Sequence, residues 1–280
     1  MRSRLPSLGH NIGQLTDQHP LKTQAPPVAL ITGGAHGLGA ATCVAMAKRG
    51  VHLIIADIDQ PAAETTVATC REIGVKAHFI HTDLAQTDGP ARLVSAAHSQ
   101  WQRLDILVNN AAYAIAEPFI DMSADEWDRV YGLNMRAVAL TTASAGRVMR
   151  QQGSGRIVNI TSPASRMALP NYTAYAASKA AVDAITRAAA VALATDGVRV
   201  NSVAPGMMDT ALQEKSEREL LAIEGRTDLA SYLEERTARI PLAQRVTTSD
   251  VAAAIIYLAL DAPDYVTAER LNISGGLDRD

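Results

Sequence analysis

The stretch YTAYAASKA at residues 172–180 holds the residues best suited to acid–base chemistry. Tyr175 and Lys179 are four residues apart, so on a helix their side chains are neighbours. Tyr172 is seven residues before the lysine, about 10 Å along a helix axis. A nearby ammonium group favours the phenolate and lowers the pKa of a tyrosine from about 10. We therefore expect Tyr175, rather than Tyr172, to exchange protons near neutral pH.

The elements that must position this pair alternate along the chain. Apolar runs predict strands at Val28–Thr32, Val51–Ala56, Ala77–His81, Asp105–Asn109, Arg156–Ile160, Val198–Val203 and Arg270–Ile273. Helical spacing predicts helices at Gly39–Arg49, Ala62–Ile73, Asp88–Arg103, Ala124–Gln151 and Tyr172–Thr195, the last capped by Asn171. This alternation predicts an α/β fold, one Rossmann-type doubly wound parallel sheet of about seven strands with helices on both faces. Ligands bind such sheets at the carboxyl ends of the strands.

Composition limits the possible partners. The chain has 280 residues, is 48% hydrophobic and carries a net charge of −3, so no global field attracts nucleic acid or a membrane. The longest apolar run, Val251–Leu260, is too short to span a bilayer. Two cysteines, Cys43 and Cys70, provide neither a disulfide framework nor a cysteine zinc site, which fits a reducing cytoplasm. We expect no metal.

Residues 1–27 differ from the rest of the chain. They are polar, contain four prolines and lack the apolar core of a secretory signal. They could form a flexible tail or an arm that packs on a partner subunit. We expect a polar, flexible extension at 1–27 and a single domain at 28–280.

The segment ALITGGAHGLGAA, residues 29–41, places a glycine turn directly after the first strand. Gly33, Gly37 and Gly39 follow a G-x-x-x-G-x-G spacing. Such a turn allows the backbone to approach a pyrophosphate and leaves a helix N-terminus open to negative charge. A purely structural turn is the alternative, but this position favours dinucleotide binding.

Asp57 ends the second strand, 24 residues beyond Gly33. A carboxylate there can accept hydrogen bonds from an adenosine ribose and would repel a 2′-phosphate. Ile58 follows it, and His36 rather than Arg or Lys precedes Gly37. We therefore expect NAD rather than NADP, although a solvated loop acid would give the same pattern.

Polar residues also end the third and fourth strands. Asp83 could meet the adenine edge. Asn109 and Asn110 must find hydrogen-bond partners if buried, either by tying strands together or by lining the cofactor cleft.

From Val28 to Leu277 the chain resembles the short-chain dehydrogenase/reductase family. The resemblance is carried by TGGAHGLG, NNAA, the asparagine of GLNMRA, Ser162, YAASK and NSVAPGMMDT. Each motif is weak alone, but the set is specific. It implies direct hydride transfer between a nicotinamide and a substrate carbon, without a metal.

The resemblance implies a role for each catalytic candidate. Tyr175 exchanges the proton, and Ser162 stabilises the charge on the substrate oxygen. Lys179 lowers the pKa of the tyrosine and binds the nicotinamide ribose. Asn134 holds a water that links the lysine to solvent. Ser162 lies 13 residues before Tyr175, the spacing usual in the family, whereas Ser165 lies ten before it.

The same resemblance implies the binding residues. The cofactor site comprises Gly33, His36, Gly37, Leu38, Gly39, Asp57, Ile58, Asp83, Leu84, Asn110, Ala111, Tyr175, Lys179, Pro205, Gly206 and Thr210. The substrate pocket comprises Ser162, Ala164, Tyr172, Met207 and Met208, with Met167 and Tyr113 as further candidates, under a lid at about 207–240.

Three positions depart from the family pattern. Ala112 replaces the glycine of N-N-A-G, Ser274 replaces an acid before the paired glycines, and Pro163 directly follows the candidate serine. We expect Ala112 to be tolerated and Pro163 to stiffen its loop and remove one backbone donor.

The resemblance also frames the function. The expected substrate is a secondary alcohol or ketone, with a polyol or sugar-like compound as the favoured class. The alternatives are an NADPH-dependent ketone or 3-oxoacyl reductase and a dinucleotide sensor without catalysis. The resemblance implies that the long alanine-rich helices pair subunits into a homotetramer. We expect no nucleic-acid or membrane partner.

Overall fold

The computed structural model describes residues 25–277, so most of the 1–27 extension lies outside the described residues. Seven strands form one sheet in the order β3-β2-β1-β4-β5-β6-β7, and every neighbouring pair is parallel. They are β1 (Val28–Thr32), β2 (His52–Asp57), β3 (Ala77–His81), β4 (Ile106–Asn109), β5 (Gly155–Ile160), β6 (Val198–Pro205) and β7 (Arg270–Ile273). The predicted doubly wound parallel fold is confirmed, with strand ends shifted by at most two residues.

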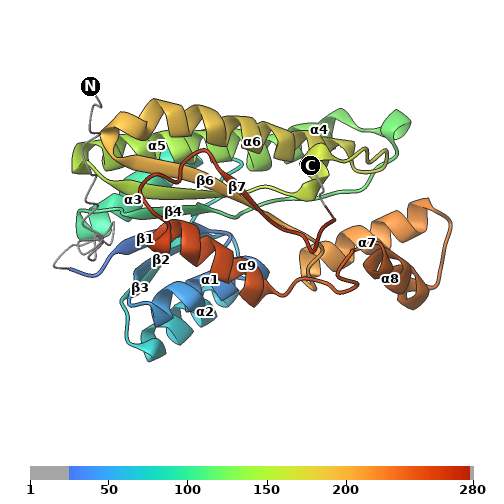
Figure 1. Ribbon diagram of the computed structural model, residues 1–280, viewed down its shortest axis with the longest axis horizontal. Helices are drawn as coiled ribbons and strands as arrows, with labels where there is room; N and C mark the ends of the chain where they lie inside the picture. The colour runs from blue at the N-terminus through green and yellow to red at the C-terminus, as the bar shows by residue number, and fades with distance from the viewer. Residues whose placement is uncertain (1–24, 278–280) are drawn as a thin grey trace, which may run out of the picture.

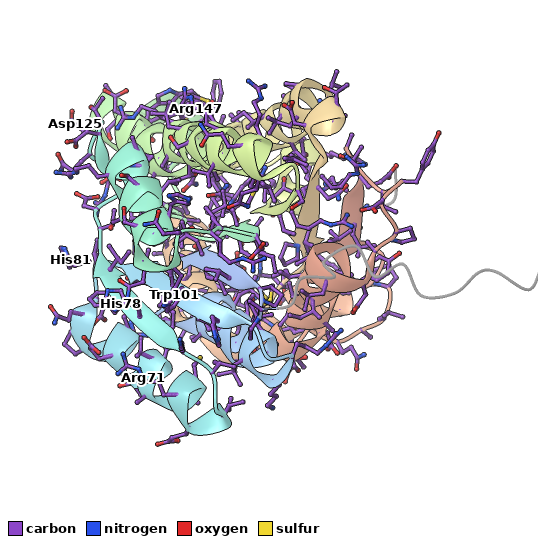
Figure 2. All side chains as sticks on the ribbon, turned by 90° about the vertical axis from the view of Figure 1, so that its left-hand side faces the viewer. Arg71, His78, His81, Trp101, Asp125 and Arg147 are labelled. Atoms are coloured by element: carbon purple, nitrogen blue, oxygen red, sulfur yellow. The ribbon has the colours of Figure 1, made fainter. Side chains whose placement is uncertain are left out.

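Two layers of helices cover the sheet (Figure 1). They are α1 (Gly37–Lys48), α2 (Gln60–Ile73) and α9 (Thr248–Ile256) on one face, and α3 (Gly89–Trp101), α4 (Ala124–Tyr131), α5 (Val138–Gln152) and α6 (Thr173–Leu193) on the other. Figure 2 shows Arg71 of α2 and Arg147 of α5 on opposite sides of the sheet. The lid helices α7 (Ala211–Ile223) and α8 (Leu229–Ala238) project beyond one end of the sheet (Figure 1).

Burial on both faces explains why β1, β2 and β4 are almost wholly apolar. Along β1, Leu30 packs with the α3, α5 and α6 side, while Ile31 packs with the α1, α2 and α9 side. Both are fully buried. Burial of one such side chain contributes about 1.5–3 kcal/mol. Because no face of the central strands meets water, the polar residues collect at the strand ends, where the site forms.

The topological switch lies between β1 and β4. The chain runs outward from β1 to β3, then crosses back to β4 on the other side of β1. The loops that follow β1 and β4 therefore diverge, and the space between them can receive a ligand.

Two predicted helices differ in the structure. The expected helix at Ala124–Gln151 is interrupted by a π-helical turn at Gly132–Ala137, between α4 and α5. The expected cap at Asn171 is wrong, because α6 begins at Thr173 and Tyr172 occupies the cap position without a capping side-chain hydrogen bond. The carbonyl of Asn171 instead accepts a hydrogen bond from the backbone N–H of Glu117 (3.1 Å).

Cys43 and Cys70 lie buried as free thiols in α1 and α2. Burial raises the pKa of both thiols, that of Cys70 to about 11. They therefore stay protonated and act as apolar packing residues. Within residues 25–277 no helix has the length and apolarity needed to cross a membrane.

Candidate active site

One cavity of about 810 Å³ collects nearly all the site residues predicted from the sequence. It is lined by residues that follow β1, β2, β3, β4, β5 and β6, and by residues of α6, α7 and α8. Every predicted catalytic, cofactor and pocket residue lines it except Gly39 and Asn134. Of the two further pocket candidates, Met167 lines it and Tyr113 does not.

The glycine turn forms the floor of one half of this cavity. Gly33 and Gly37 have positive φ angles, +65° and +49°, which favour glycine. A Cβ on Gly33 would come within 2.8 Å of the Ala111 backbone, and a Cβ on Gly39 would overlap the carbonyl oxygen of Gly33. Gly39 thus lets the turn close on itself, while Gly33 and Gly37 leave the surface open. A bare backbone cradle at the start of α1 fits the pyrophosphate of a dinucleotide.

Asn109 and Asn110, at the end of β4, have different hydrogen-bond partners and different structural roles. Asn109 is buried and donates from Nδ2 to Thr142 Oγ1 (3.0 Å) and Asn159 Oδ1 (2.8 Å), which ties β4 to α5 and β5. Asn110 donates from Nδ2 to the carbonyl oxygens of Thr32 (3.0 Å) and Gly33 (2.9 Å). Only Asn110 lines the cavity, so it joins the glycine turn to β4 at the cofactor cleft.

Asp57 is held rigidly at the end of β2. Its Oδ2 accepts from the backbone N–H of Ala35 (3.0 Å), and its Oδ1 accepts from those of Ile58 (2.8 Å) and Asp59 (3.1 Å). A carboxylate has about four acceptor sites, so roughly one remains, on Oδ2. The side chain therefore connects the glycine turn to β2 and still presents a negative charge to the cavity.

Two neighbours complete this end of the cavity. His36 pairs through Nε2 with Asp59 Oδ2 (2.8 Å) and is largely exposed. Asp83 accepts from the Gln86 side chain (3.0 Å) and the Ala85 backbone (2.9 Å), and these bonds lower its pKa. Asp57 and Asp83 both present a carboxylate to the cavity, and within residues 25–277 no Lys or Arg side chain forms an ion pair with either of them.

Burial dominates the chemistry of Tyr175. It raises the pKa of the phenol to about 12, and a hydrogen bond with Ser162 opposes that rise. The Lys179 ammonium lies 5.5 Å from the ring centroid and donates to the carbonyl oxygen of Ile160 (2.9 Å). The expected lowering of the tyrosine pKa by Lys179 is therefore wrong, because desolvation of the phenol raises this pKa.

Lys179 is itself strongly affected by burial. Burial lowers its pKa to about 8, and the negative charge of Asp183 partly opposes this. Between about pH 8 and the usual value of 10.5, the unfolded chain holds a proton on this amine that the folded chain has lost. Stability must therefore rise with pH in this window through Lys179.

We expect this rise to disappear in Lys179→Met. Urea unfolding at pH 7.5 and 9.5 should show the wild type gaining stability relative to the variant, by up to about 1.4 kcal/mol per pH unit. Because the wild type and the variant share all their other titrating groups, the contributions of those groups largely cancel when the two free energies of unfolding are subtracted. Parallel pH profiles for the two proteins would show that Lys179 keeps an ordinary pKa.

Tyr172 belongs to the wall of the cavity. Its ring lies 4.7 Å from that of Tyr175, centroid to centroid, and its hydroxyl is 2.8 Å from Ser216 Oγ. Burial raises the pKa of this phenol far above its usual value. Ser216, on α7, is a contact that the sequence alone did not reveal. It connects the lid to the helix that carries Tyr175.

Asn134 lies in the π-helical turn and is fully buried. Its Oδ1 accepts from the backbone N–H of Tyr113 (2.8 Å), and its Nδ2 donates to the Tyr113 carbonyl (2.8 Å) and to Ser178 Oγ (3.1 Å). Ser178 in turn donates to the carbonyl oxygen of Tyr175 (2.7 Å). Asn134 is thus connected through Ser178 to the backbone of the helix that carries Tyr175 and Lys179. The water relay predicted for Asn134 stays a prediction.

The three departures from the family pattern fit the backbone. Ala112 lines the cavity without a positive φ angle, so its methyl group brings no backbone strain. Pro163 occupies the first position of a short 3₁₀ helix, where an N–H would lack a helical partner, so the loss of this backbone donor leaves no helical hydrogen bond unmade. Ser162 Oγ accepts there from the Ala164 N–H (3.2 Å). Ser274 is buried against Gly206.

Several functional candidates were missed from the sequence. Arg236, Arg239 and Glu224 of the lid line the cavity. The only signal of them in the sequence was their charge. Arg270 of β7 donates to the carbonyl oxygen of Ser162 (3.0 Å), across 108 residues of sequence that no pattern connects. Within residues 25–277 no cluster of His, Cys, Asp or Glu could hold a metal ion.

Comparisons with known proteins agree with this geometry. The family model for short chain dehydrogenases matches residues 27–220. The chain belongs to the short-chain dehydrogenase family. It is 36% identical over 253 residues to cis-4-hydroxycyclohexanecarboxylate dehydrogenase of Sinomonas cyclohexanicum. The matched residues cover 90% of this chain and 96% of that protein. The predicted family membership is thereby confirmed, as is an oxidoreductase activity on alcohol or ketone groups.

Solved structures of family members have the same fold. An actinorhodin polyketide ketoreductase with NADPH is 30% identical, with a TM-score of 0.87 over 92% of this chain and 99% of that one. An NAD⁺-bound xylitol dehydrogenase is 28% identical, with a TM-score of 0.86 over 89% and 98%. The short-chain dehydrogenase fold therefore binds a nicotinamide dinucleotide here, and the relatives include both NAD and NADP structures.

Proposed function

We propose that this short-chain dehydrogenase is an NAD(H)-dependent oxidoreductase that interconverts a secondary alcohol and a ketone. One observation carries the proposal. Tyr175, Ser162 and Lys179 line the same cavity as Asp57, so an acid–base group and a ribose acceptor share one cleft. The glycine cradle lies between them and suits the pyrophosphate that would connect the two ends.

Tyr175 is the group that exchanges the proton with the substrate oxygen. With a pKa raised to about 12 its hydroxyl is protonated at neutral pH, ready to donate to a ketone. Oxidation of an alcohol requires the phenolate, which the Lys179 charge and the positive charge of an oxidised nicotinamide would both favour. Ser162 donates to the substrate oxygen as its negative charge develops. The bound dinucleotide supplies the hydride acceptor or donor.

Asp57 supports NAD over NADP. Its charge is fixed by three backbone N–H groups, and its remaining acceptor site suits a ribose hydroxyl rather than a phosphate. Neither Ile58 nor His36, which is paired with Asp59, offers a free cation for a 2′-phosphate. The NADPH-bound ketoreductase relative favours the opposite assignment, an NADPH-dependent ketone reductase. Because the Asp57 carboxylate would repel a 2′-phosphate, the NADPH-dependent ketone reductase is the second candidate.

The substrate half of the cavity supports an alcohol with a hydrocarbon body. Its apolar lining includes Met167, Leu169, Met207, Leu212 and Leu220. The NAD⁺-bound xylitol dehydrogenase relative supports the polyol class predicted from the sequence. The hydroxycyclohexanecarboxylate dehydrogenase relative supports a cyclic secondary alcohol. We favour the cyclic class, since the apolar side chains of this wall can pack against a hydrocarbon ring.

The test is absorbance at 340 nm with NAD⁺ and then NADP⁺, across polyols, sugars, hydroxy acids and cyclic alcohols. We expect NADH formation with one chemical group and little NADPH formation. Activity with NADP⁺ alone would overturn the cofactor assignment. Turnover of none of these alcohols in a protein that binds NADH would favour the sensor alternative.

Quaternary structure and location stay predictions. Val191 on α6 is 77% exposed and Leu140 on α5 is 39% exposed, and small alanines surround them, as an interface between copies would require. We propose a cytoplasmic homotetramer, for which a solution mass near four times 29.7 kDa is the check.

A further inference from the structure

The substrate end of the cavity carries charged side chains that alcohol–ketone chemistry does not use. Arg236 and Arg239 of α8 line it together with Glu224 at the end of α7. These lid helices stand beyond the carboxyl end of the sheet (Figure 1). An arginine at an apolar pocket is suited to a carboxylate, because its planar fork can donate two parallel hydrogen bonds.

Two arginines under the lid approach the same buried acid, Glu217. Glu217 is 1% exposed and accepts from Arg245 at both oxygens, Nη1 to Oε2 (3.1 Å) and Nη2 to Oε1 (2.8 Å). Arg236 Nε reaches the same carboxylate only at 3.4 Å. Two guanidinium groups therefore share one buried acid. The other acid near Arg245 is Asp209, which is 81% exposed and screened by water.

The remaining contacts of Arg236 are with neutral groups, and they include a hydrogen bond with the Tyr232 side chain. Its Nη2 lies 3.8 Å from Met207 Sδ, and its guanidinium carbon lies 5.6 Å from the centroid of the Tyr232 ring. Its side chain is 24% exposed, so water screens its charge only in part. A carboxylate would be a much stronger partner than a thioether or an aromatic face.

Arg236 is also close to the reacting centre. Burial raises the pKa of the Tyr172 phenol, and Arg236 is one of the groups that oppose this rise. The Tyr172 ring in turn contacts that of Tyr175, with the two ring planes tilted by 44°. A substrate that reaches from Tyr175 past Tyr172 would therefore bring its far end to the guanidinium group.

Glu224 does not cancel this positive charge. It is exposed, its Oε1 accepts from the Tyr232 hydroxyl (3.1 Å), and its charge also acts on Arg226. Arg239 is exposed and lines the cavity as a second cation, although its charge also acts on Glu235.

We propose that the substrate carries a carboxylate distant from its reacting carbon, and that Arg236 binds it, with Arg239 as the second cation. The substrate class is then a hydroxy acid, or the matching keto acid, with a hydrocarbon body that fits the apolar wall. This inference rests on the proposed activity at Tyr175.

The first test measures binding without turnover. The protein saturated with NADH is titrated by calorimetry with cyclohexanecarboxylate and with cyclohexanecarboxamide, which lack a reacting hydroxyl. We expect the acid to bind at least tenfold more tightly. Arg236→Gln should remove this preference and leave the affinity for the amide within threefold, while Arg236→Lys should retain part of it. Arg218→Gln is the matched control, because Arg218 pairs with Glu214 on the exposed side of α7 and lies outside the cavity.

Three outcomes would overturn the carboxylate site: equal affinity for acid and amide, an equal loss of both in Arg236→Gln, or binding of neither. Oxidation of 4-hydroxycyclohexanecarboxylate and its amide then separates the two proposals. Equal turnover of both would refute the site while the dehydrogenase stands. Selective binding of the acid without oxidation of any alcohol would refute the activity while the site stands.

Discussion

Tyr175→Phe should lower kcat by about 10²–10⁴-fold, the usual contribution of a positioned general acid or base. The variant removes a single oxygen from a half-buried ring and keeps the tilted ring contact with Tyr172. It also keeps Lys179, whose ammonium donates to the carbonyl oxygen of Ile160 rather than to the phenol. We therefore expect the fold and the affinity for NADH to change little. The measurement is kcat at 340 nm with NADH binding followed by fluorescence.

Tyr172→Phe is the matched control, since it makes the same change three residues earlier in the chain. Its hydroxyl is engaged with Ser216 (2.8 Å), so its loss should loosen the lid contact and lower kcat by less than tenfold. If both variants lost activity equally, the hydroxyl of Tyr175 would have no special role. If Tyr175→Phe stayed fully active, proton transfer would have to be assigned to another group.

Asp57→Asn should change the ratio of kcat/KM with NAD⁺ to kcat/KM with NADP⁺ by about 10²-fold in favour of NADP⁺. Two charges about 4 Å apart near a protein surface interact by about 4 kcal/mol, and the variant removes this repulsion from a 2′-phosphate. The amide also loses a hydrogen bond, because its NH₂ cannot accept from a backbone N–H as both oxygens of Asp57 do. The ratio is used because a general loss of affinity cancels in it.

Asp59→Asn provides the comparison for this change. Asp59 is also acidic and pairs with His36, but it does not line the cavity, and an asparagine can still cap α2 from this position. We expect its cofactor ratio to stay within about threefold of the wild type. A similar shift in both variants would indicate a diffuse field rather than a ribose contact at Asp57. An unchanged ratio in Asp57→Asn would remove the argument for NAD.

The fold could be read from the sequence because its signals are local. A strand buried on both faces must be apolar throughout, as in VALIT of β1, and the helices between strands show their own periodicity. The glycines at 33 and 37 mark positive φ angles that side chains rarely adopt. The spacing of Tyr175 and Lys179 gave their proximity, because four residues make one helical turn.

What the sequence could not supply was the environment of these residues. Proximity to Lys179 suggested a lowered pKa for Tyr175, yet burial raises it to about 12. Desolvation depends on every element that closes around the ring, including the lid, and no local pattern encodes it. The capping role expected of Asn171 failed because α6 begins one residue later than predicted, so Tyr172 occupies the cap position.

The tertiary structure alone decided the roles of the two asparagines and the lid arginines. Asn109 and Asn110 are adjacent in sequence, but Asn109 is the last residue of β4 and ties it to α5 and β5, whereas Asn110 begins the loop after β4 and meets the cofactor cleft. Arg236 looked like one charge of a solvated helix. Only the folding of α8 over the cavity, with Glu217 already bound by Arg245, gives it a charge to offer a substrate.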